Sequence, residues 1–364
     1  MRTAVFALTP MGVKTAQRVR AALPEADIFV GARCRAEFPE AQAFSRLSEI
    51  VGAKFHSYDA LVFLMATGIV VRTIAPLLRG KLEDPAILVL DEQAHHVISL
   101  LSGHVGGANA LTRQLAQALG SDPVITTATD VEGRLAPDAI AGRLGLFPQP
   151  HNAILSVNRA LLSGREVVYC IDTRLRLAEF YAEALRALGL AVRPVPGDGA
   201  SAAAQVESEG KVAVLITDAR QRKCQGRHLR LCPRRLIAGV GCRRGVAADE
   251  IEQALAASLS HLGLPKDAVD VMATTEVKKD EAGLRETAKK RGIPLHFYDQ
   301  RALQAMVDRY GLQESPFVRK TIGVGNVAEA AALAEAGAAR GRLALGKTKF
   351  KKVTVALVWQ TLQS

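Results

Sequence analysis

Short apolar runs alternate with amphipathic stretches along most of this chain, and this alternation constrains its fold more than any other feature. A short apolar run bounded by turn residues has the length of a buried strand, and apolar residues at helical spacing indicate a helix. The predicted strands are Ala4–Leu8, Leu61–Ala66, Ala86–Asp91, His96–Leu101, Val124–Thr127, Val167–Asp172, Val212–Asp218, Leu236–Gly241, Val269–Ala273, Leu295–Tyr298, Arg342–Leu345 and Val353–Trp359. The predicted helices are Gly12–Ala22, Ala108–Leu119, Glu179–Leu188, Asp249–Leu262, Gly283–Arg291 and Ala328–Ala336. This order predicts a multi-domain α/β chain with largely parallel sheets flanked by helices.

Length and composition limit the number of domains. The chain has 364 residues, of which 49% are hydrophobic and 23% charged, as in globular proteins. At roughly 100–200 residues per domain, two or three domains are expected. Boundaries are expected near Asp130 and within the basic connector Gln221–Arg235. They give an N-terminal α/β domain (1–130), a middle domain (131–235) and a C-terminal α/β domain (236–364).

Positive charge is concentrated in the second and third predicted domains. The chain has 47 Lys and Arg against 36 Asp and Glu, a formal net charge of +11. Residues 1–130 carry 12 basic and 12 acidic side chains, residues 131–235 carry 16 and 10, and residues 236–364 carry 19 and 14. A positive field attracts polyanions. Aromatic residues are only 5% and do not interleave with basic ones, which disfavours stacking on single-stranded nucleic acid. We expect a small polycarboxylate and no nucleic acid as the partner. The alternative is that the arginines are merely solvated on helix faces.

We expect a cytoplasmic protein with no membrane contact. The longest apolar stretches, within Leu61–Ala66 and Ile69–Val71, are far shorter than the roughly 20 residues of a membrane span. The apolar run at the N-terminus is too short for a secretory signal. The five cysteines include no CxxC pair, and the eight histidines show no metal-ligand spacing. A disulfide framework and a metal held by the protein are therefore not expected.

The segment Ser102–Asn109 is the most unusual one for function. It links a predicted strand to a predicted helix and contains Gly103, Gly106 and Gly107. Small residues allow a ligand to approach the backbone, and N–H groups at a helix start favour an anion or an oxyanion. His104 adds a group that exchanges a proton near neutral pH. The alternative is a turn that merely needs flexible backbone, with His104 exposed.

Other polar residues follow predicted strands. Thr67 and Gly68 lie at a strand end, where open α/β sheets bind ligands, and Arg72 lies one helical turn later. Thr127 and Asp130 follow another strand and are candidates for ligand contact or for a general base. The alternatives are a surface arginine and residues that cap a helix.

The C-terminal part contains three comparable loops. Gly241, Arg243 and Arg244 belong to a glycine-rich loop that suits an anion but is a weak dinucleotide fingerprint. Lys278 and Glu281 lie in a run of charged residues that suits acid–base chemistry or a solvated helix start. In a third loop, Asn326 matches a helix N-cap, and the glutamate three residues later matches a capping-box position.

Together these segments resemble the cobalt-precorrin-5A hydrolase (CbiG) family of anaerobic cobalamin biosynthesis. In the N-terminal part the resemblance rests on MATGIVVRTIAPLLRGK, DPAILVLDE, SLLSGHVGGANALTRQLA and PVITTATD. In the C-terminal part it rests on IAGVGCRRG, TTEVKKDEAGL and TIGVGNVAEAAALA. The resemblance covers nearly the whole chain, and so many ordered blocks are far more specific than one glycine loop. The middle region is placed by its position alone.

The resemblance implies a hydrolase that opens the δ-lactone of a cobalt-bearing, contracted-ring precorrin. A two-carbon fragment leaves as acetaldehyde, and the product is cobalt-precorrin-5B. The substrate carries several acetate and propionate carboxylates, which suit the positive charge of the chain. No cofactor of the protein is expected, because the substrate carries the cobalt. Transient contact with neighbouring enzymes of the corrin pathway is expected.

Residue chemistry suggests roles within this reaction. Water would attack the lactone carbonyl with His104 or Asp130 as general base, and Glu281 is a rival base. The N–H groups of Gly106 and Gly107 would stabilise the oxyanion. The predicted substrate-binding residues are Thr67, Gly68, Arg72, Gly103, Gly106, Gly107, Asn109, Thr127, Gly241, Arg243, Arg244, Lys278 and Asn326.

Two other functions stay open on the sequence. A tetrapyrrole carrier would use the C-terminal loops to hold a pathway intermediate without chemistry, and it would release no acetaldehyde. A nucleotide-dependent transferase would use the glycine loops for phosphate. The transferase ranks last, because the chain contains no Walker motif.

Overall fold

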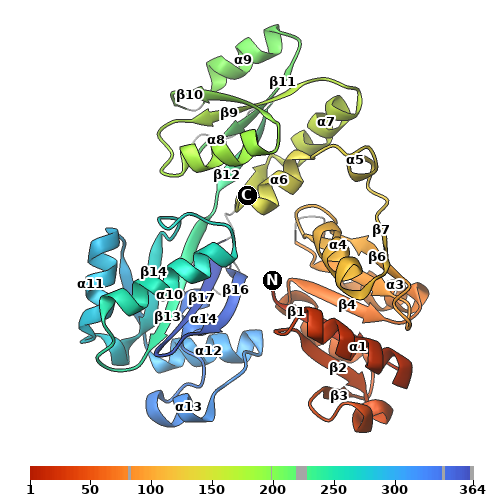
Figure 1. Ribbon diagram of the computed structural model, residues 1–364, viewed down its shortest axis with the longest axis vertical. Coiled ribbons are helices and arrows are strands. Elements are labelled where there is room, and N and C mark those ends of the chain that lie inside the picture. The colour runs from red at the N-terminus through yellow and green to blue at the C-terminus, as the bar shows by residue number, and fades with distance from the viewer. Residues whose placement is uncertain (81–82, 198, 219–227, 338–340, 361–364) are drawn as a thin grey trace. The chain divides into compact units, whose positions relative to one another are not determined.

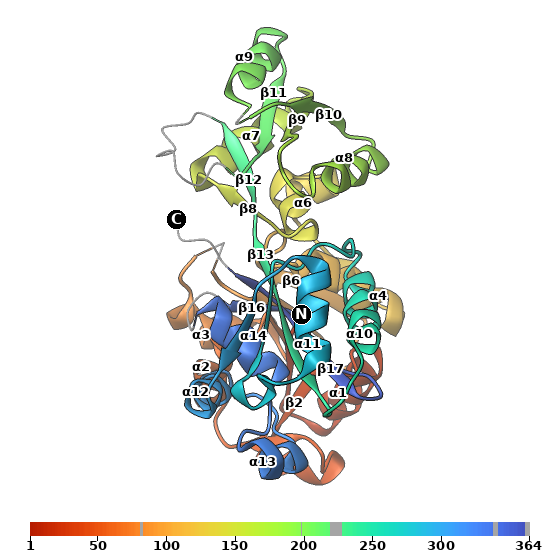
Figure 2. The same cartoon turned by 90° about the vertical axis from the view of Figure 1, so that its left-hand side faces the viewer.

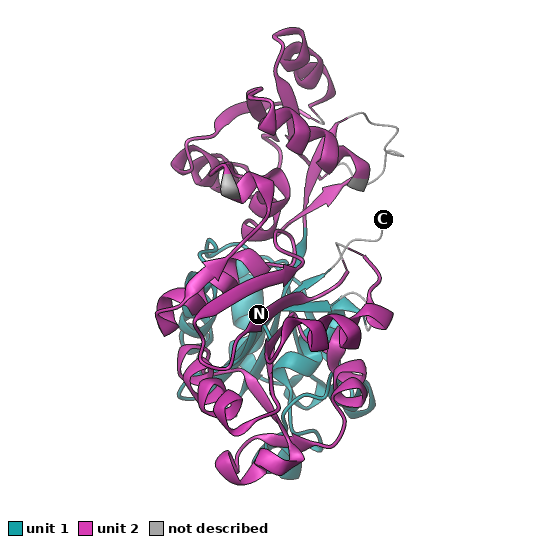
Figure 3. Ribbon diagram, turned by 90° about the vertical axis from the view of Figure 1, so that its right-hand side faces the viewer, with its two compact units in different colours: residues 1–2, 234–363 teal, residues 3–233, 364 magenta. Residues whose placement is uncertain are grey.

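Three β-sheets flanked by helices make up the computed structural model of this protein (Figure 1). It describes residues 1–80, 83–197, 199–218, 228–337 and 341–360. The chain divides into two compact units (Figure 3). Residues 3–233 hold two of the sheets, and residues 234–363, together with 1–2, hold the third.

The first sheet has the strand order β3-β2-β1-β4-β5-β6-β7. Strands β1 to β5 are parallel, β6 is antiparallel to β5, and β7 is parallel to β6. The strands are β1 (Thr3–Ala7), β2 (Asp27–Gly31), β3 (Gln42–Phe44), β4 (Ala60–Leu64), β5 (Ala86–Leu90), β6 (His96–Leu101) and β7 (Asp122–Val124). The helices are α1 (Pro10–Ala22), α2 (Leu47–Lys54), α3 (Thr67–Ile74) and α4 (Ala108–Leu119).

Apolar side chains cover both faces of this sheet. Every residue of β1, β4 and β5 is buried, as expected for parallel strands with helices on both sides. Val13 of α1 and Leu115 of α4 belong to the core on one face. Val51 of α2 and Val70 of α3 belong to the core on the other face, where Phe6 stacks between two further phenylalanines.

The direction of strand addition reverses between β1 and β4. Helix α1 leads from β1 to β2 on one side, and α2 leads from β3 back to β4 on the other. Open α/β sheets bind ligands at the carboxyl ends of the strands beside such a reversal. Thr67 and Gly68 begin α3, with two residues between them and the end of β4 at Leu64, so two of the predicted substrate-binding residues lie near this point.

The second sheet has the order β10-β9-β11-β12-β8, in which only β8 is antiparallel to its neighbour. The strands are β8 (Leu146–Gln149), β9 (Val167–Asp172), β10 (Ala191–Val195), β11 (Val212–Ile216) and β12 (Leu229–Pro233). The helices of this region are α5 (Ala128–Val131), α6 (Pro137–Arg143), α7 (His151–Leu162), α8 (Ala178–Ala187) and α9 (Ala200–Ser208).

The third sheet has the order β15-β14-β13-β17-β16. Strands β13, β14 and β15 are parallel, whereas β17 is antiparallel to both of its neighbours. The strands are β13 (Arg235–Cys242), β14 (Val271–Thr275), β15 (Leu295–Tyr298), β16 (Gly341–Lys349) and β17 (Val353–Gln360). The helices are α10 (Ala248–His261), α11 (Ala282–Arg291), α12 (Gln300–Tyr310), α13 (Pro316–Ile322) and α14 (Ala328–Ala336).

The structure confirms the predicted α/β class and corrects some elements. The strand predicted at Val124–Thr127 is wrong in its position, because β7 ends at Val124 and the chain then enters α5. The strand predicted at Val269–Ala273 lies two residues later, as β14. Five strands that the sequence analysis does not predict are β2, β3, β8, β10 and β12.

The three sheets are built from residues 3–124, 146–233 and 235–360. Each predicted domain therefore contains one sheet, except that the third sheet begins at Arg235, one residue before the predicted boundary. The first two sheets nevertheless share one compact unit. Residues 221–227 of the predicted connector lie outside the described residues. The three-domain division stays a prediction.

Candidate active site

The imidazole of His104 lies between two carboxylates. It follows β6 in the loop that leads to α4, and its side chain is 5% exposed. Nδ1 lies 3.1 Å from Asp138 Oδ2, and Nε2 lies 2.9 Å from Asp130 Oδ2. A carboxylate can only accept a hydrogen bond, so both ring nitrogens must carry a hydrogen for both contacts to form. This arrangement favours an imidazolium.

The pKa shifts of the pair agree with this geometry. Burial lowers the pKa of His104, but the hydrogen bonds and charges of Asp138 and Asp130 outweigh it and raise the pKa above its ordinary value. Burial raises the pKa of Asp130, but Arg113 and His104 outweigh it and lower the pKa below its ordinary value. An imidazolium has no lone pair, and a carboxylate of low pKa binds a proton weakly. In this resting state the pair suits proton donation better than the general-base role expected from the sequence.

The carboxylate of Asp130 accepts hydrogen bonds from further side chains. Asn109 Nδ2 lies 2.8 Å from Asp130 Oδ2 and also reaches Thr127 Oγ1 at 3.2 Å. Arg113 donates from its guanidinium to Asp130 Oδ1 at 2.5 Å. The structure therefore joins four of the predicted site residues, His104, Asn109, Thr127 and Asp130, in one network.

Sequence reasoning missed four members of this network. Two are hydroxyl groups: Thr129 Oγ1 lies 3.2 Å from His104 Nε2, and Ser99 Oγ donates to Asn109 Oδ1 at 2.6 Å. The other two are Arg113 and Asp138.

Arg113 lies four residues after Asn109 on α4, and that one-turn spacing could have indicated it. Asp138 is fully buried in the first turn of α6, directly after Pro137. Its sequence context is that of an ordinary acidic residue at a helix start, so no pattern distinguishes it.

Backbone hydrogen bonds within the loop Ser102–Asn109 occupy several of its own N–H groups. Gly107 N–H donates to His104 O at 3.0 Å, and Ala108 N–H donates to Ser102 O at 3.2 Å. Asn109 N–H donates to Gly103 O at 3.0 Å. The expectation that Gly107 offers an unpaired donor for an oxyanion is therefore wrong.

Packing within the loop explains its other glycines. A Cβ atom at Gly106 would overlap Ser102, and one at Gly103 would lie 2.7 Å from Asn109 Oδ1. Both glycines thus allow the loop to fold tightly upon itself. Their predicted contact with substrate stays a prediction.

Thr67, Gly68 and Arg72 form a second group, on α3. Arg72 is exposed, and its guanidinium donates to Gly68 O at 3.0 Å. Ile69 and Val71 on the same helix are 41% and 45% exposed. An arginine beside exposed apolar side chains suits a macrocycle with peripheral carboxylates.

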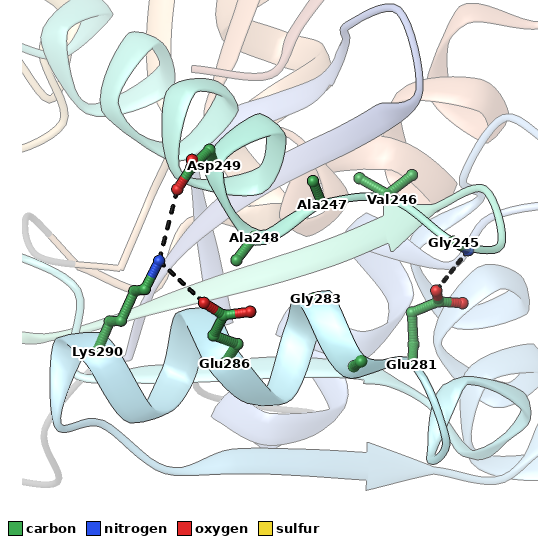
Figure 4. A pocket seen from close by; sticks show the side chains of 10 residues that line it. Gly245, Val246, Ala247, Ala248, Asp249, Glu281, Gly283, Glu286 and Lys290 are labelled. Atoms are coloured by element: carbon green, nitrogen blue, oxygen red, sulfur yellow. Dashed lines mark hydrogen bonds and ion pairs between the residues drawn. The ribbon is translucent and has the colours of Figure 1, made fainter.

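Lys278 and Glu281 form an internal pair in the C-terminal unit. Lys278 Nζ lies 3.4 Å from Glu281 Oε2, and the two side chains are only 7% and 9% exposed. Gly245 N–H donates to Glu281 Oε1 at 2.6 Å (Figure 4). Both side chains are thus occupied by internal partners, which weakens Glu281 as a rival base and Lys278 as a substrate contact.

A pocket of about 300 Å³ lies beside this pair, between the start of α10 and α11. Its charged lining consists of Asp249, Glu281, Glu286 and Lys290. Carboxylates outnumber the one ammonium group, and Lys290 is paired with Asp249 and Glu286. The pocket is therefore poorly suited to an anion.

Asn326 lies one residue before Val327, the N-cap of α14, and its side chain still makes a hydrogen bond to the helix start. Its Oδ1 accepts from Glu329 N–H at 3.2 Å, and its Nδ2 donates to Gln313 O at 3.1 Å and to Glu329 Oε2. The residue is 1% exposed. This commitment to the start of α14 leaves its predicted substrate contact without structural support.

Gly241, Arg243 and Arg244 end β13 and begin the following loop. A Cβ atom at Gly241 would lie 2.6 Å from Thr354 Oγ1, so this glycine allows the two strands to approach. Both arginines are exposed. Burial raises the pKa of the neighbouring Cys242 to about 11, so its thiol is not ionised at neutral pH.

In the part of the chain that the structure describes, no group of three or more His, Cys, Asp or Glu side chains is arranged as a metal site. None of the helices described combines the length and the apolar character that crossing a bilayer requires.

Known proteins share these segments. Two family profiles match: "Cobalamin synthesis G N-terminal" over residues 49–130 and "Cobalamin synthesis G C-terminus" over residues 236–358. A cobalt-precorrin-5A hydrolase from Salmonella typhimurium is 37% identical over 332 residues, which cover 90% of each chain. The chain belongs to the cobalt-precorrin-5A hydrolase family.

Other comparisons extend this family assignment. A cobalt-precorrin-5A hydrolase from Priestia megaterium is 31% identical over 366 residues, which cover 98% of this chain and 94% of that one. A crystal structure of a cobalamin biosynthesis protein G homolog from Sulfolobus solfataricus matches with a TM-score of 0.59 at 20% identity. That match covers 99% of this chain and 97% of the other, so the two share a fold. The family resemblance seen in the sequence is confirmed.

Proposed function

We propose that this chain is a cobalt-precorrin-5A hydrolase, which opens the δ-lactone of its substrate and releases acetaldehyde to give cobalt-precorrin-5B. The observation that carries the proposal is the 37% identity to the S. typhimurium hydrolase over 90% of both chains. The network around His104 supports a site for proton transfer, because it holds a buried imidazolium against the partly exposed Asp130.

In the first step, His104 supplies a proton. Water adds to the lactone carbonyl carbon and loses one of its protons to solvent, and the bond from that carbon to the ring oxygen breaks. The departing alkoxide takes a proton that passes from His104 Nε2 by way of Asp130, whose side chain is 15% exposed. The products are a carboxylic acid, which ionises to solvent, and an alcohol. His104 is then neutral.

In the second step, the neutral His104 takes a proton back. The alcohol loses its proton to His104 through Asp130, and its oxygen forms the carbonyl of acetaldehyde. The carbon–carbon bond to the macrocycle breaks, and its electron pair passes to the macrocycle, which takes a proton from solvent. His104 thus ends the cycle as the imidazolium with which it began.

Asp138 is a positioning residue in this scheme. Its Oδ2 holds His104 Nδ1 at 3.1 Å, and its side chain is fully buried. A buried carboxylate on one ring nitrogen fixes the orientation of the other and stabilises the charged ring. The second nitrogen is therefore aimed at Asp130.

The proposal places the cobalt in the substrate and no cofactor on the protein. A chelator added to the purified enzyme is therefore expected to leave turnover unchanged. We also place the reaction in the cytoplasm, and transient contact with neighbouring enzymes of the corrin pathway stays a prediction.

The decisive experiment mixes the purified protein with cobalt-precorrin-5A. We expect acetaldehyde and cobalt-precorrin-5B in equal amounts, measured with an aldehyde-trapping reagent and by mass spectrometry. A carrier would bind the compound but release no aldehyde. Binding without release would therefore overturn the hydrolase assignment.

The variant His104→Gln tests the proton-transfer site. Because a positioned acid–base group contributes roughly 100-fold or more, turnover is expected to fall by at least that factor. Activity of the wild type should also decline as pH rises through the raised pKa of His104, because the imidazolium is the starting form.

His261→Gln is the matched control, since this histidine is exposed near the end of α10. It should keep full turnover. An activity of the wild type that falls on the acidic side near neutral pH, instead of the alkaline side, would assign His104 the role of base.

A further inference from the structure

Six basic side chains gather at one edge of the third sheet. Four of them are Lys347, Lys349, Lys351 and Lys352, which lie in and beside the β16–β17 turn within the sequence KTKFKK. Arg243 and Arg244, at the end of β13, supply the other two. We call this set the basic edge.

Strand register brings the two segments together. Strand β17 lies between β13 and β16 (Figure 1; Figure 2 shows the same strands turned by 90°). Thr354 of β17 is opposite Lys349 on one side and Gly241 on the other. Arg243 N–H donates to Lys352 O at 2.9 Å, so the arginine loop and the lysine turn are bonded directly. The two segments that carry the basic edge are therefore adjacent along their backbones.

Two carboxylates compensate part of this charge: Glu250 lies near Lys351 and Lys352, and Glu329 lies near Lys347. Lys352 Nζ lies 3.1 Å from a carboxylate oxygen of Glu250. Among the residues described, the side chains of the other five members make no ion pair. Lys349, Lys351 and both arginines are exposed, and like charges so close together repel one another. An anion bound here would relieve that repulsion.

A bulge in β16 and a hydrogen bond to α14 stabilise the conformation of the β16–β17 turn. A register shift between Leu345 and Thr348 forms a bulge in β16, and Lys347 N–H there donates to Glu329 Oε1 at 3.0 Å. The other oxygen of Glu329 accepts from Asn326, one residue before the N-cap of α14. Asn326, from the TIGVGN segment, thus supports the basic edge through Glu329.

The surroundings of Lys347 lower the pKa of its ammonium group. Burial lowers its pKa, the charge of Lys349 lowers it further, and Glu329 opposes both. A half-buried ammonium with a nearby like charge gains more from a bound carboxylate than a fully exposed lysine does.

We propose that the basic edge binds peripheral carboxylates of the corrinoid substrate. The ligand identity rests on the proposed function, whose substrate carries several acetate and propionate groups. Charge complementarity selects this occupant, and the low aromatic content of the turn, Phe350 alone, argues against stacked nucleic-acid bases. The new assignments are Lys347, Lys349 and Lys351, beside the two arginines expected from the sequence.

The test measures binding of two cobalt corrinoids by quenching of Trp359, the only tryptophan of the chain. One corrinoid has free acetate and propionate side chains, and the other has the same side chains as primary amides. In K349Q/K351Q, affinity for the carboxylate form should fall roughly threefold to tenfold, and affinity for the amide form should stay unchanged. The salt dependence of carboxylate binding should also become shallower.

The matched control is K266Q/K289Q, which removes two charges from exposed lysines of the same compact unit. It should bind both corrinoids like the wild type, and K349R/K351R should restore binding. An equal loss in the control, or an equal loss for the amide form, would overturn the proposal. If K349Q/K351Q loses binding to a duplex oligonucleotide but keeps wild-type affinity for both corrinoids, the proposal is also overturned. The basic edge would then be a surface for nucleic acid.

Acetaldehyde release separates this inference from the proposed function. If the wild type releases none but K349Q/K351Q still loses carboxylate binding, the hydrolase assignment fails and the binding site stands. If K349Q/K351Q releases acetaldehyde with an unchanged KM and binds the carboxylate corrinoid like the wild type, the binding site fails and the hydrolase assignment stands.

Discussion

His104 shows how the surroundings of one side chain change its chemistry. From the sequence it is a histidine in a glycine loop, a candidate general base. In the structure, Asp138 and Asp130 occupy its two nitrogens and favour the protonated ring. The type and position of the residue could be predicted, but its protonation could not, because Asp138 is 34 residues away and belongs to another helix.

The network predicts a particular pH dependence of stability. His104→Gln leaves a buried carboxylate without its cation and should lower the free energy of unfolding by roughly 3–5 kcal/mol. The raised pKa of His104 stabilises the fold fully below its ordinary value of 6.5 and less as pH rises through the higher folded value. The lowered pKa of Asp130 stabilises the fold fully above its ordinary value of 3.8, and this contribution is lost as pH falls through the lower folded value. The difference between wild type and variant should therefore be largest between those two ordinary values.

Denaturant unfolding at several pH values measures this difference. His261→Gln, an exposed substitution, should change the free energy of unfolding by less than about 0.5 kcal/mol throughout. A gap between wild type and His104→Gln that widens from neutral to alkaline pH would contradict a buried imidazolium.

At the scale of elements, glycines set how closely the third sheet and its helix approach. Gly239 lies in β13 where the start of α14 crosses it, and a Cβ atom there would overlap Ala328 O. Gly239 lies within the predicted strand Leu236–Gly241, just before the glycine-rich loop that suits an anion. The structure shows that this glycine serves helix packing, a contact between residues 89 positions apart that no local pattern reports.

Gly239→Ala should therefore displace α14 and destabilise the protein by roughly 1–3 kcal/mol. Gly52→Ala is the control, because this glycine lies within α2 and an added Cβ would meet nothing within 4 Å. Alanine favours a helix over glycine, so the control should be neutral or about 1 kcal/mol more stable. Thermal unfolding of both variants checks this, and equal melting temperatures would refute the close approach.

At the scale of the whole molecule, each hydrophobic cluster seen among the described residues belongs to one sheet. One cluster of the C-terminal unit joins Ile237, Val271, Leu303, Leu333 and Val358. It contains residues only from the third sheet and the helices and loops that belong to it. A chain segment that carries its own core is expected to fold alone.

We expect residues 234–364, expressed alone, to unfold in one cooperative transition. Circular dichroism during denaturation with urea, compared with the full chain, measures this. A gradual loss of signal without a transition would show that this unit needs the rest of the chain.

The α/β class follows from the sequence because buried parallel strands are continuous apolar runs, as β4, β5 and β9 illustrate. Strands β3 and β10 escaped prediction for a physical reason. The first has only three residues, and the second is mostly half-exposed and contains Pro194, so neither forms a clear apolar run. Sheet order and the pairing of β13 with the C-terminal β17 depend on distant contacts, which local spacing does not encode.

The contact between His104 and Asp138 crosses the border that the sequence suggests at residue 130. The N-terminal family profile also stops there, at Asp130, and leaves Asp138 outside. A chimera spliced at this border would inherit the histidine from one parent and its counterion from the other. Module exchange among homologues should therefore tolerate a junction placed after Arg143, the end of α6, far better than one that follows the apparent seam.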